Sequence, residues 1–338
     1  MKKYLLPQSG RFYKANLHCH STVSDGRWSP EEIKKRYMEK GYSIVAYTDH
    51  DVFILHNELT DKEFLALNGI EYGFNNGVLP KKLSKNCDIG MIALKHDTVI
   101  QPCWHRKKYM TPGCTLNFKP FVRFDESKPD FERIYTPECI NRMIKEGVDS
   151  GFFVTYNHPT WSNEEYTDYI NYNGMHAMEI CNYGCVASGN DEHNTRIYEE
   201  MLKSGKRLLC TATDDNHNKY GEDDSFGGFT VIKAEKLEYE TITNALLRGE
   251  YYSSEGPVID ELWYEDGMVH ITFEPAKLVF TNKMTRNISK VSAPDGEFIT
   301  EATFAVEDDD GYFRITVVGA DGKRAYTNAY FLDDILEK

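Results

Sequence analysis

Long hydrophobic runs are absent from this 338-residue sequence, so no segment has the length of an apolar membrane span. Basic residues are in the minority, with 39 Lys and Arg against 53 Asp and Glu and a formal net charge of −14. An acidic chain is poorly suited to general binding of nucleic acid or anionic membranes. The eight cysteines do not suggest a disulfide framework, and the opening MKKYLLPQSGRFYK lacks the apolar core of a signal peptide. We therefore expect a cytoplasmic protein that binds neither membranes nor nucleic-acid polymers.

The length leaves room for one catalytic domain and a smaller second domain. Hydrophobic residues make up 41% of the chain and aromatic residues 13%, which is typical of a globular protein with an apolar core. The pattern changes near Glu255-Gly256-Pro257, because no convincing helical period follows. We predict a first domain over residues 1–257 and a second over residues 258–338.

Short apolar runs alternate with amphipathic segments in the first domain, a pattern typical of parallel β/α units. One helix is expected to begin with Ser29 as its N-cap and Pro30 as its first residue, and to stop at Gly41. Further helices are expected over 136–147 and roughly 191–204. The predicted strands are 14–20, 43–51, 64–73, 88–95, 152–159, 177–182 and 208–217. This order favours a β/α barrel.

The second domain has the alternation of half-buried strands, with apolar residues at every other position over 269–273 and 313–317. Asp-Gly pairs, a strong hairpin signal, stand at 266–267, 295–296, 310–311 and 321–322. We predict a small antiparallel β domain with a sandwich-like arrangement.

The segment HCHSTVSDG, residues 18–26, carries the first candidate functional side chains. Alternate side chains of a strand share a face, so His18 and His20 are expected to point the same way and Cys19 the other way. Two imidazoles followed by the carboxylate of Asp25 would form half of a metal site. If this segment stood alone, a pair of surface histidines would explain it better than a metal site. The metal-site interpretation therefore depends on further candidate ligands elsewhere in the chain.

Most of the predicted strands end in residues that can bind a metal ion. The carboxyl ends of barrel strands gather at one mouth, so these residues would meet in one pocket. Five histidines and three carboxylates are too many for one tetrahedral zinc and suit two or three divalent ions of zinc, manganese or iron. The eight residues are His18, His20, Asp25, His50, Glu71, His158, Asp215 and His217.

Five motifs, in this order, resemble the polymerase and histidinol phosphatase (PHP) family. They are HxH with a following SDG (18–26), TDH (48–50), GIE (69–71), NHP (157–159) and TDDNH (213–217). The resemblance covers about residues 13–257, and the stretches 246–259 and 319–332 are similar to the CehA/McbA-like group, which carries a C-terminal β domain. The resemblance implies a distorted seven-stranded β/α (TIM-like) barrel and a metal-dependent phosphoesterase.

The resemblance also implies how the ligands divide among the ions. Glu71 would bridge to a third ion that is bound by His158. Relatives with three metals have a further histidine where this chain reads Cys87-Asp88-Ile89-Gly90, so the sequence departs from the family pattern at the third ion. The first ion would be held by His18, His20, Glu71 and Asp215, and the second by Asp25, His50 and His217, with Asp25 standing where many relatives have histidine.

The implied reaction is hydrolysis of a phosphate ester, a small phosphomonoester or a nucleotide, by a hydroxide that bridges the metals. The partner would be a small phosphorylated substrate. The same cage could hydrolyse a carbamate or another carboxylic ester. A non-catalytic metal- or carbohydrate-binding module is the alternative of another class, and the near-complete ligand set argues against it. The expected catalytic residues are His18, His20, Glu71, His158, Asp215 and His217.

A long irregular segment, residues 96–135, follows the fourth predicted strand and belongs at the mouth of the barrel. It contains a positive cluster, His105 to Lys108, in an otherwise acidic protein. We predict that Arg106, with Lys107 or Lys108, binds the substrate phosphate or a second anionic group of the substrate. A solvated basic loop explains the cluster equally well.

Three acidic residues beside the motifs are left with open roles. Asp49 precedes His50 and is better explained as a partner that orients an imidazole than as a ligand. Asp214 is ambiguous beside Asp215. Glu179 could reach the site, although contacts with backbone donors would explain it better.

Overall fold

The computed structural model describes residues 2–110, 113–219 and 223–336. The strands are β1 (Lys2–Tyr4), β2 (Arg11–Asn16), β3 (Ile44–Tyr47), β4 (Leu65–Asn75), β5 (Asn86–Ala93), β6 (Phe152–Asn157), β7 (Ala177–Asn182), β8 (Leu209–Thr213), β9 (Phe229–Ala234), β10 (Tyr251–Ser254), β11 (Ile259–Glu265), β12 (Met268–Ala276), β13 (Leu278–Lys283), β14 (Lys290–Ser292), β15 (Ile299–Ala305), β16 (Tyr312–Val318), β17 (Arg324–Thr327) and β18 (Tyr330–Phe331). The α-helices are α1 (Pro30–Glu39), α2 (Pro137–Asp149), α3 (Tyr166–Tyr169), α4 (Tyr183–Ala187), α5 (Thr195–Lys203), α6 (Tyr239–Arg248) and α7 (Leu332–Ile335), and the 3₁₀ helices are η1 (Asn57–Leu59), η2 (Lys81–Leu83), η3 (Gly113–Asn117) and η4 (Lys119–Phe121).

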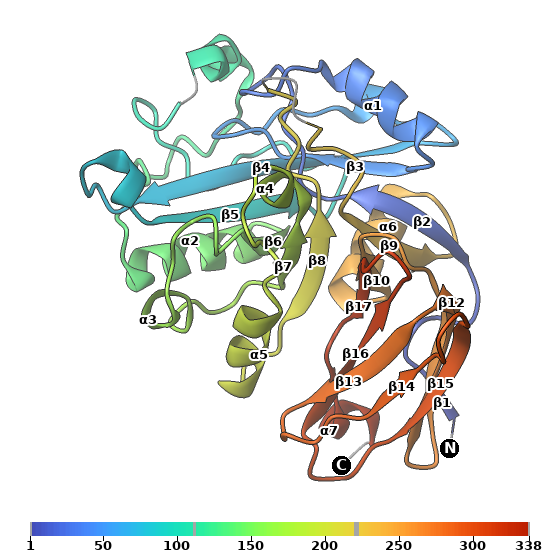
Figure 1. Ribbon diagram of the computed structural model, residues 1–338. Helices are drawn as coiled ribbons and strands as arrows, with labels where there is room; N and C mark the ends of the chain where they lie inside the picture. The colour runs from blue at the N-terminus through green and yellow to red at the C-terminus, as the bar shows by residue number, and fades with distance from the viewer. Residues whose placement is uncertain (1, 111–112, 220–222, 337–338) are drawn as a thin grey trace.

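The seven strands predicted for the first domain are present as β2 to β8 (Figure 1). The predicted helices correspond to α1, α2 and α5. The expected cap of α1 is confirmed, because the Ser29 side chain accepts a hydrogen bond from the Glu32 amide and Pro30 is the first helical residue. The first strand ends earlier than predicted, at Asn16, and His18 and His20 lie just beyond it, on either side of a bridge between Cys19 and Asn216.

The expectation of parallel β/α units is only partly correct. β2, β3 and β4 are parallel, and so are β6, β7 and β8, but β5 is antiparallel to both of its neighbours. Only residues 76–85 separate β4 from β5. A parallel crossover needs a dozen residues or more, so this short connection produces a hairpin.

The expected closed TIM-like barrel is not confirmed, because the sheet is not closed. Its order is β14-β13-β16-β17-β10-β9-β2-β3-β4-β5-β6-β7-β8, with β18 on β16. β9 pairs with β2 and β10, so both of its edges are taken and β8 pairs with β7 alone among the described strands. Side chains of β9 and β10 contact the backbone of β8 in place of a strand pairing. Ser253 of β10 donates to the carbonyl of Cys210, and Thr230 of β9 donates to the carbonyl of Ala212.

The C-terminal part is built of antiparallel strands that belong to two sheets. A second sheet, in the order β1-β11-β12-β15, packs on the β13–β16 end of the large sheet through apolar residues that include Leu262, Ile271 and Ile315. All four Asp-Gly pairs lie between consecutive strands, and Asp266 and Gly267 both have positive φ in the β11–β12 hairpin. Figure 1 shows the N-terminal β1 beside the C-terminal strands, and it pairs with β11.

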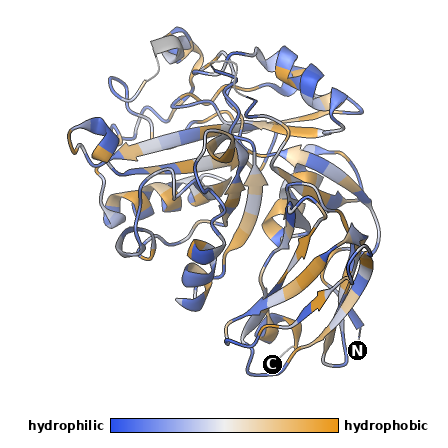
Figure 2. Ribbon diagram, in the orientation of Figure 1, coloured by the Kyte–Doolittle hydropathy of each residue, from blue (hydrophilic) through white to orange (hydrophobic). Residues whose placement is uncertain are grey.

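The two predicted domains therefore share both sheets. Strands β1 and β10 lie before residue 257, and they pair with β11 and β17, which lie after it. The division at that residue stays a prediction. Figure 2 shows hydrophobic residues concentrated in the strands, whereas α1 is mostly hydrophilic. None of the described helices is both long and apolar enough to cross a lipid bilayer.

Candidate metal centre

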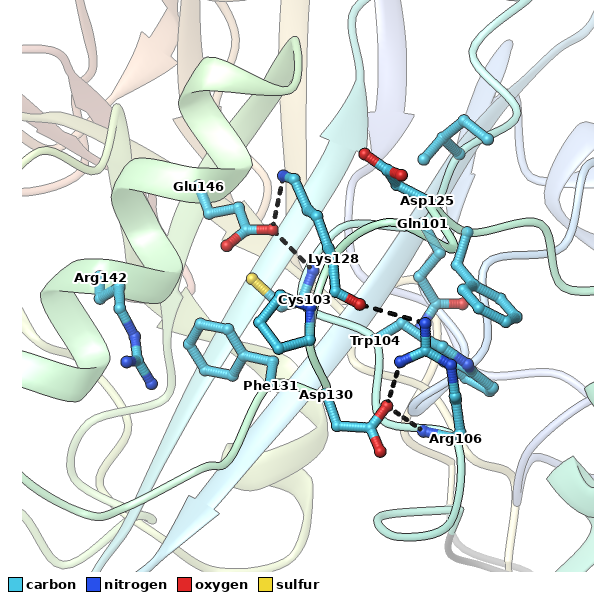
Figure 3. A pocket seen from close by; sticks show the side chains of 13 residues that line it. Gln101, Cys103, Trp104, Arg106, Asp125, Lys128, Asp130, Phe131, Arg142 and Glu146 are labelled. Atoms are coloured by element: carbon cyan, nitrogen blue, oxygen red, sulfur yellow. Dashed lines mark hydrogen bonds and ion pairs between the residues drawn. The ribbon is translucent and has the colours of Figure 1, made fainter.

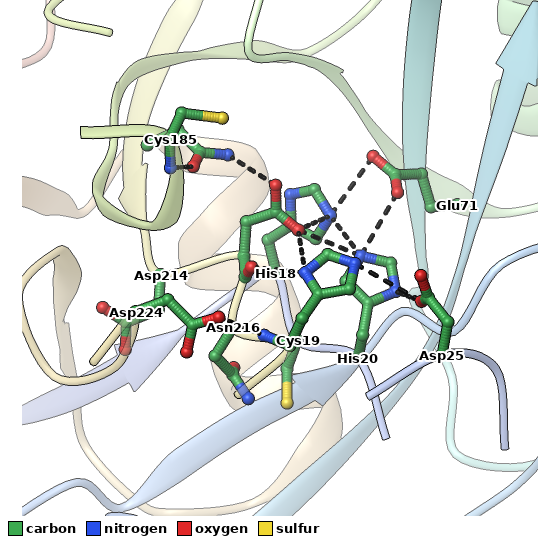
Figure 4. Close-up of polar contacts among 12 residues, drawn as sticks. His18, Cys19, His20, Asp25, Glu71, Cys185, Asp214, Asn216 and Asp224 are labelled. Carbon is green, nitrogen blue, oxygen red and sulfur yellow. Dashed lines mark hydrogen bonds and ion pairs between the residues drawn. The ribbon is translucent and has the colours of Figure 1, made fainter. Parts of the chain in front are cut away.

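The eight predicted ligands come together at one place. His18 and His20 follow β2, Asp25 lies on the next loop, His50 follows β3, His158 follows β6, and Asp215 and His217 follow β8. Glu71 is the exception, because it lies within β4, at a bridge with His50. Figure 4 shows the Glu71 carboxylate turned toward the rings of His18 and His20.

The four residues expected to hold the first ion, His18, His20, Glu71 and Asp215, form the tightest group. The Nε2 atoms of His18 and His20 lie 3.0 Å apart, and each lies 3.0–3.2 Å from Oδ1 of Asp215. Glu71 approaches both rings, with Oε1 at 3.2 Å from His18 and Oε2 at 3.3 Å from His20. Ligand atoms around a tetrahedral ion with bonds of about 2.0–2.2 Å are separated by about 3.4 Å, so this group has the dimensions of a metal site.

The second predicted group surrounds Asp25. Its Oδ1 lies 3.3 Å from Nε2 of His217 and 3.6 Å from Nε2 of His50. The ring centroids of His50 and His217 each lie 4.3 Å from that of His20. The buried Oδ1 atoms of Asp25 and Asp215 make no hydrogen bond. Buried carboxylate oxygens without a donor are rare, and a bound cation would satisfy them.

A third group contains a residue that the sequence analysis did not assign. Nε2 of His158 lies 3.3 Å from Oε1 of Glu71 and 3.8 Å from Oδ2 of Asp88. Asp88 thus stands near the position where the family pattern has a histidine. The sequence does place Asp88 at the start of the strand that follows the GIE motif, where a ligand is expected. Because relatives have a histidine there, the carboxylate was not counted among the predicted ligands. The donor set Glu71, Asp88 and His158 could hold a third ion.

Buried neighbours hold the ligands in place. Nδ1 of His18 lies 2.7 Å from Glu179, which also accepts hydrogen bonds from Thr213 and from the amide of His158. Glu179 therefore supports a ligand rather than serving as one, a common arrangement in metal sites. Asn157 donates to Oε1 of Glu71, at 2.8 Å. Gly90 leaves room for Asn157, because a Cβ on Gly90 would lie 3.0 Å from its side-chain nitrogen.

The two open aspartates also have structural roles. Asp49 accepts hydrogen bonds from the amides and hydroxyls of Ser21 and Ser24, and so fixes the loop that leads to Asp25. Asp214 accepts from the amides of residues 226, 227 and 228. The backbone of Asp215 has a φ of +51°, a conformation that residues other than glycine rarely adopt. Such strain is often found at functional sites.

Neighbouring charges and burial change the pKa of several side chains in the centre. Burial opposes a charge on His20 and His158, yet the carboxylates of Asp215 and Glu71 outweigh it and raise the pKa of both histidines to about 10. Burial and the positive charge of His20 lower the pKa of His50 to about 4. Burial and the charge of Glu71 raise the pKa of Asp88 to about 8. Metal ions bind deprotonated ligands, so binding here would release protons.

Two cavities open beside the ligands, and both are lined by Asp25, His50 and Asp88. The larger one, about 610 Å³, also contains Arg133, which is held by Asp51 at 2.6 Å. The other, about 440 Å³, contains Lys219, which forms an ion pair with Asp25. Neither cation was singled out by the sequence analysis.

The predicted substrate-binding cluster lies elsewhere. Arg106 lines a separate cavity of about 190 Å³ and donates to Asp130, at 2.5 Å, and to the carbonyl of Lys128 (Figure 3). It also donates to the carbonyl of Glu126. Lys108 pairs with Glu132, and the amide of Lys107 donates to His105. Residues 106–108 are not among those that line the two cavities beside the ligands.

Comparisons with known proteins give limited matches. No family model matches the chain. A 5'-3' exoribonuclease of Haemophilus influenzae is 39% identical over 66 residues, which are 18% of this chain and 24% of that protein. The chain thus spans about a quarter of the length of this curated relative.

Two solved structures match the chain at low similarity. One is a two-domain protein of Bacteroides vulgatus that contains a predicted PHP-like metal-dependent phosphoesterase, with 15% identity, a TM-score of 0.44, and coverage of 97% of this chain and 90% of that chain. The other is an amidohydrolase of Chromobacterium violaceum, with 15% identity, a TM-score of 0.38, and coverage of 60% of this chain and 87% of that chain. At these levels the function has to be argued from the site itself.

Proposed function

We propose that this protein is a metal-dependent hydrolase of phosphate esters, that it belongs to the PHP family, and that its relatives are the CehA/McbA-like group. One observation carries the proposal: the eight ligands expected from the motifs converge, and the spacing of His18, His20, Glu71 and Asp215 matches that around a metal ion. The motifs support the family, and the substrate that we propose is a small phosphorylated compound.

The residues present form four overlapping donor sets. Two ions are expected among them, and a third fits beside Asp88. Zinc, manganese or iron would suit this mixture of imidazole and carboxylate. When bound, the ions would lower the pKa of a water molecule and polarise a phosphoryl oxygen, which is the chemistry that ester hydrolysis requires. Glu71 is placed to serve two sets, since Oε1 faces His18 and His158 while Oε2 faces His20 and His50.

The protein would add positive charge for the anionic substrate. The guanidinium of Arg133 is buried, fixed by Asp51 and the carbonyl of Gly73, and lies against the rings of Tyr72 and Tyr109. A guanidinium held in one orientation can donate hydrogen bonds to phosphate oxygens at little entropic cost. Lys219 is placed to do the same from the other cavity. A substrate role for Arg106, Lys107 or Lys108 remains a second proposal, to be compared with Arg133.

The test compares substrates on protein that has been loaded with manganese or zinc. We expect 4-nitrophenyl phosphate to be hydrolysed with a kcat/KM that is about tenfold or more above that for 4-nitrophenyl acetate or a 4-nitrophenyl carbamate. Hydrolysis of the acyl esters alone would identify an esterase. No hydrolysis of any of them, or of a panel of nucleotides and sugar phosphates, would contradict an enzymatic role.

A matched pair of variants ties the activity to the site. Asp215→Asn removes the charge of a proposed ligand without changing its size, and should abolish most of the activity together with bound metal. Asp191→Asn makes the same chemical change at a side chain that is 93% exposed, and should leave both unchanged. Equal activity in the two variants would place the reaction elsewhere.

A further inference from the structure

We propose that Trp161 is a binding platform for a planar ring, carried by the group that is esterified to the substrate phosphate. The proposal rests on the proposed function, because the metal centre would hold the phosphate itself. It narrows the substrate class to phosphate esters of aromatic or heterocyclic alcohols, or to compounds with such a ring close to the ester.

Trp161 is unusual because a large apolar side chain is exposed beside the metal ligands. It is 46% exposed, and its ring contacts the imidazole of His158 edge to face, with centroids 5.0 Å apart and planes at 82°. It lines the cavity of about 440 Å³ together with Glu71, His158 and Asp215. An indole in this place offers apolar area and a π-face to whatever enters the cavity.

The backbone that carries Trp161 is fixed. The buried carboxylate of Glu192 accepts hydrogen bonds from the amides of Thr160, at 3.0 Å, and Trp161, at 2.6 Å. Asn194 donates to Glu192 and accepts from the Thr160 hydroxyl, while the amide of Ser162 donates to the His158 carbonyl. Because this segment is already ordered before the ligand binds, little conformational entropy is lost on binding.

The same cavity has room for a flat group. Small residues, Gly184, Cys185 and Ser188, line it along α4 and its C-terminal cap. Gly184 must stay small, because a Cβ there would come within 2.6 Å of the Asp214 carbonyl oxygen. The cavity therefore combines metal ligands that suit phosphate, an aromatic face and a wall without bulky side chains. Aliphatic groups would gain only area from the indole, whereas a ring would also gain the stacking interaction.

The experiment measures equilibrium binding of two phosphonates, which cannot be hydrolysed, to the metal-loaded protein. Phenylphosphonate carries a ring and methylphosphonate does not. We expect phenylphosphonate to bind about tenfold more tightly to the wild-type protein, which is about the contribution of one aromatic contact. Trp161→Ala should reduce this ratio to about one to two and leave methylphosphonate binding and metal content unchanged. Trp161→Phe should keep most of the ratio, and Trp161→Leu, which retains apolar bulk without a ring, should keep only part of it.

The outcomes separate the two proposals. If both phosphonates bind and their ratio is the same in Trp161→Ala as in the wild type, the platform is refuted while the phosphoesterase proposal stands. The same conclusion follows if Trp161→Leu retains the full ratio, because bulk rather than a ring would then be responsible. If neither phosphonate binds to the metal-loaded protein, the phosphate-binding role fails, and the platform fails with it.

Discussion

Asp49 provides a sharp test of how the metal centre is held together. Its buried carboxylate accepts four hydrogen bonds, from the amides of Ser21 and Ser24 and from their hydroxyls, at 2.6–3.1 Å. Asp49→Ala would leave the buried amide of Ser21 without an acceptor, at a cost of about 1–3 kcal/mol, whereas the amide of Ser24 keeps the Ser21 carbonyl as an acceptor. The hydroxyls of Ser21 and Ser24 would each lose a hydrogen bond, at about 1 kcal/mol each. We expect a total loss of about 4 kcal/mol, which for a chain of this length lowers Tm by about 6 °C.

The substitution should also weaken metal binding, because the loop that Asp49 holds positions Asp25. We expect Asp49→Ala to lose the ion bound by Asp25, His50 and His217 while it keeps the ion held by His18 and Glu71. Asp49→Asn retains one oxygen for the amides, and its stability should fall by only about 1 kcal/mol. The measurements are thermal unfolding and metal content per chain after removal of loosely bound ions.

Asp61 is the matched control, since its carboxylate also accepts hydrogen bonds from two amides, those of Glu63 and Phe64, but is exposed. Water can replace it, so Asp61→Ala should change Tm by less than Asp49→Ala and leave metal content unchanged. If Asp49→Ala kept both the wild-type Tm and the full number of metal ions, Asp49 would not be what holds this loop.

Three further predictions concern single side chains. Asp88→Asn should lower the metal content by one ion per chain, measured by elemental analysis, and an unchanged count would exclude Asp88 as a ligand. Arg133→Ala should lower kcat/KM for the best phosphate ester by about tenfold, more than Arg106→Ala, without changing metal content; the reverse order would favour the 105–108 cluster. Burial raises the pKa of Glu164 from 4.5 to about 7, against the hydrogen bonds of three tyrosines, so its folded form binds a proton more tightly than the unfolded chain. Stability should therefore decline by about 3 kcal/mol as the pH rises from about 4.5 to about 7, and denaturant titrations should show this decline reduced in Glu164→Gln.

The strands could be located from the sequence, but their directions could not. Apolar runs mark where buried strands lie, and all seven in the first part were found in this way. The same runs carry no information about pairing, so β5 was expected to be parallel although residues 76–85 are too few for a crossover. The pairing of β10 with β17 joins residues more than seventy positions apart, and no local pattern indicates it.

The site was predicted where chemistry restricts the residue type. Imidazoles and carboxylates at strand ends stand out, and all eight meet in the structure. Asp88 was missed because the family pattern has a different ligand there. The roles of Asp49 and Glu179 depend on which donors surround them after folding, and those donors come from distant segments. A run of positive charge such as 105–108 is visible in the sequence, but the partners that bind it, Asp130 and Glu132, are not.

We propose that this chain binds a multinuclear metal centre and uses it on phosphate esters. The most direct measurement is elemental analysis of protein purified without chelator, combined with hydrolysis of 4-nitrophenyl phosphate before and after the metal is removed and restored. We expect at least two transition-metal ions per chain, loss of activity when they are removed, and recovery of activity with manganese or zinc. One ion or none per chain, or hydrolysis that persists in fully metal-free protein, would contradict it.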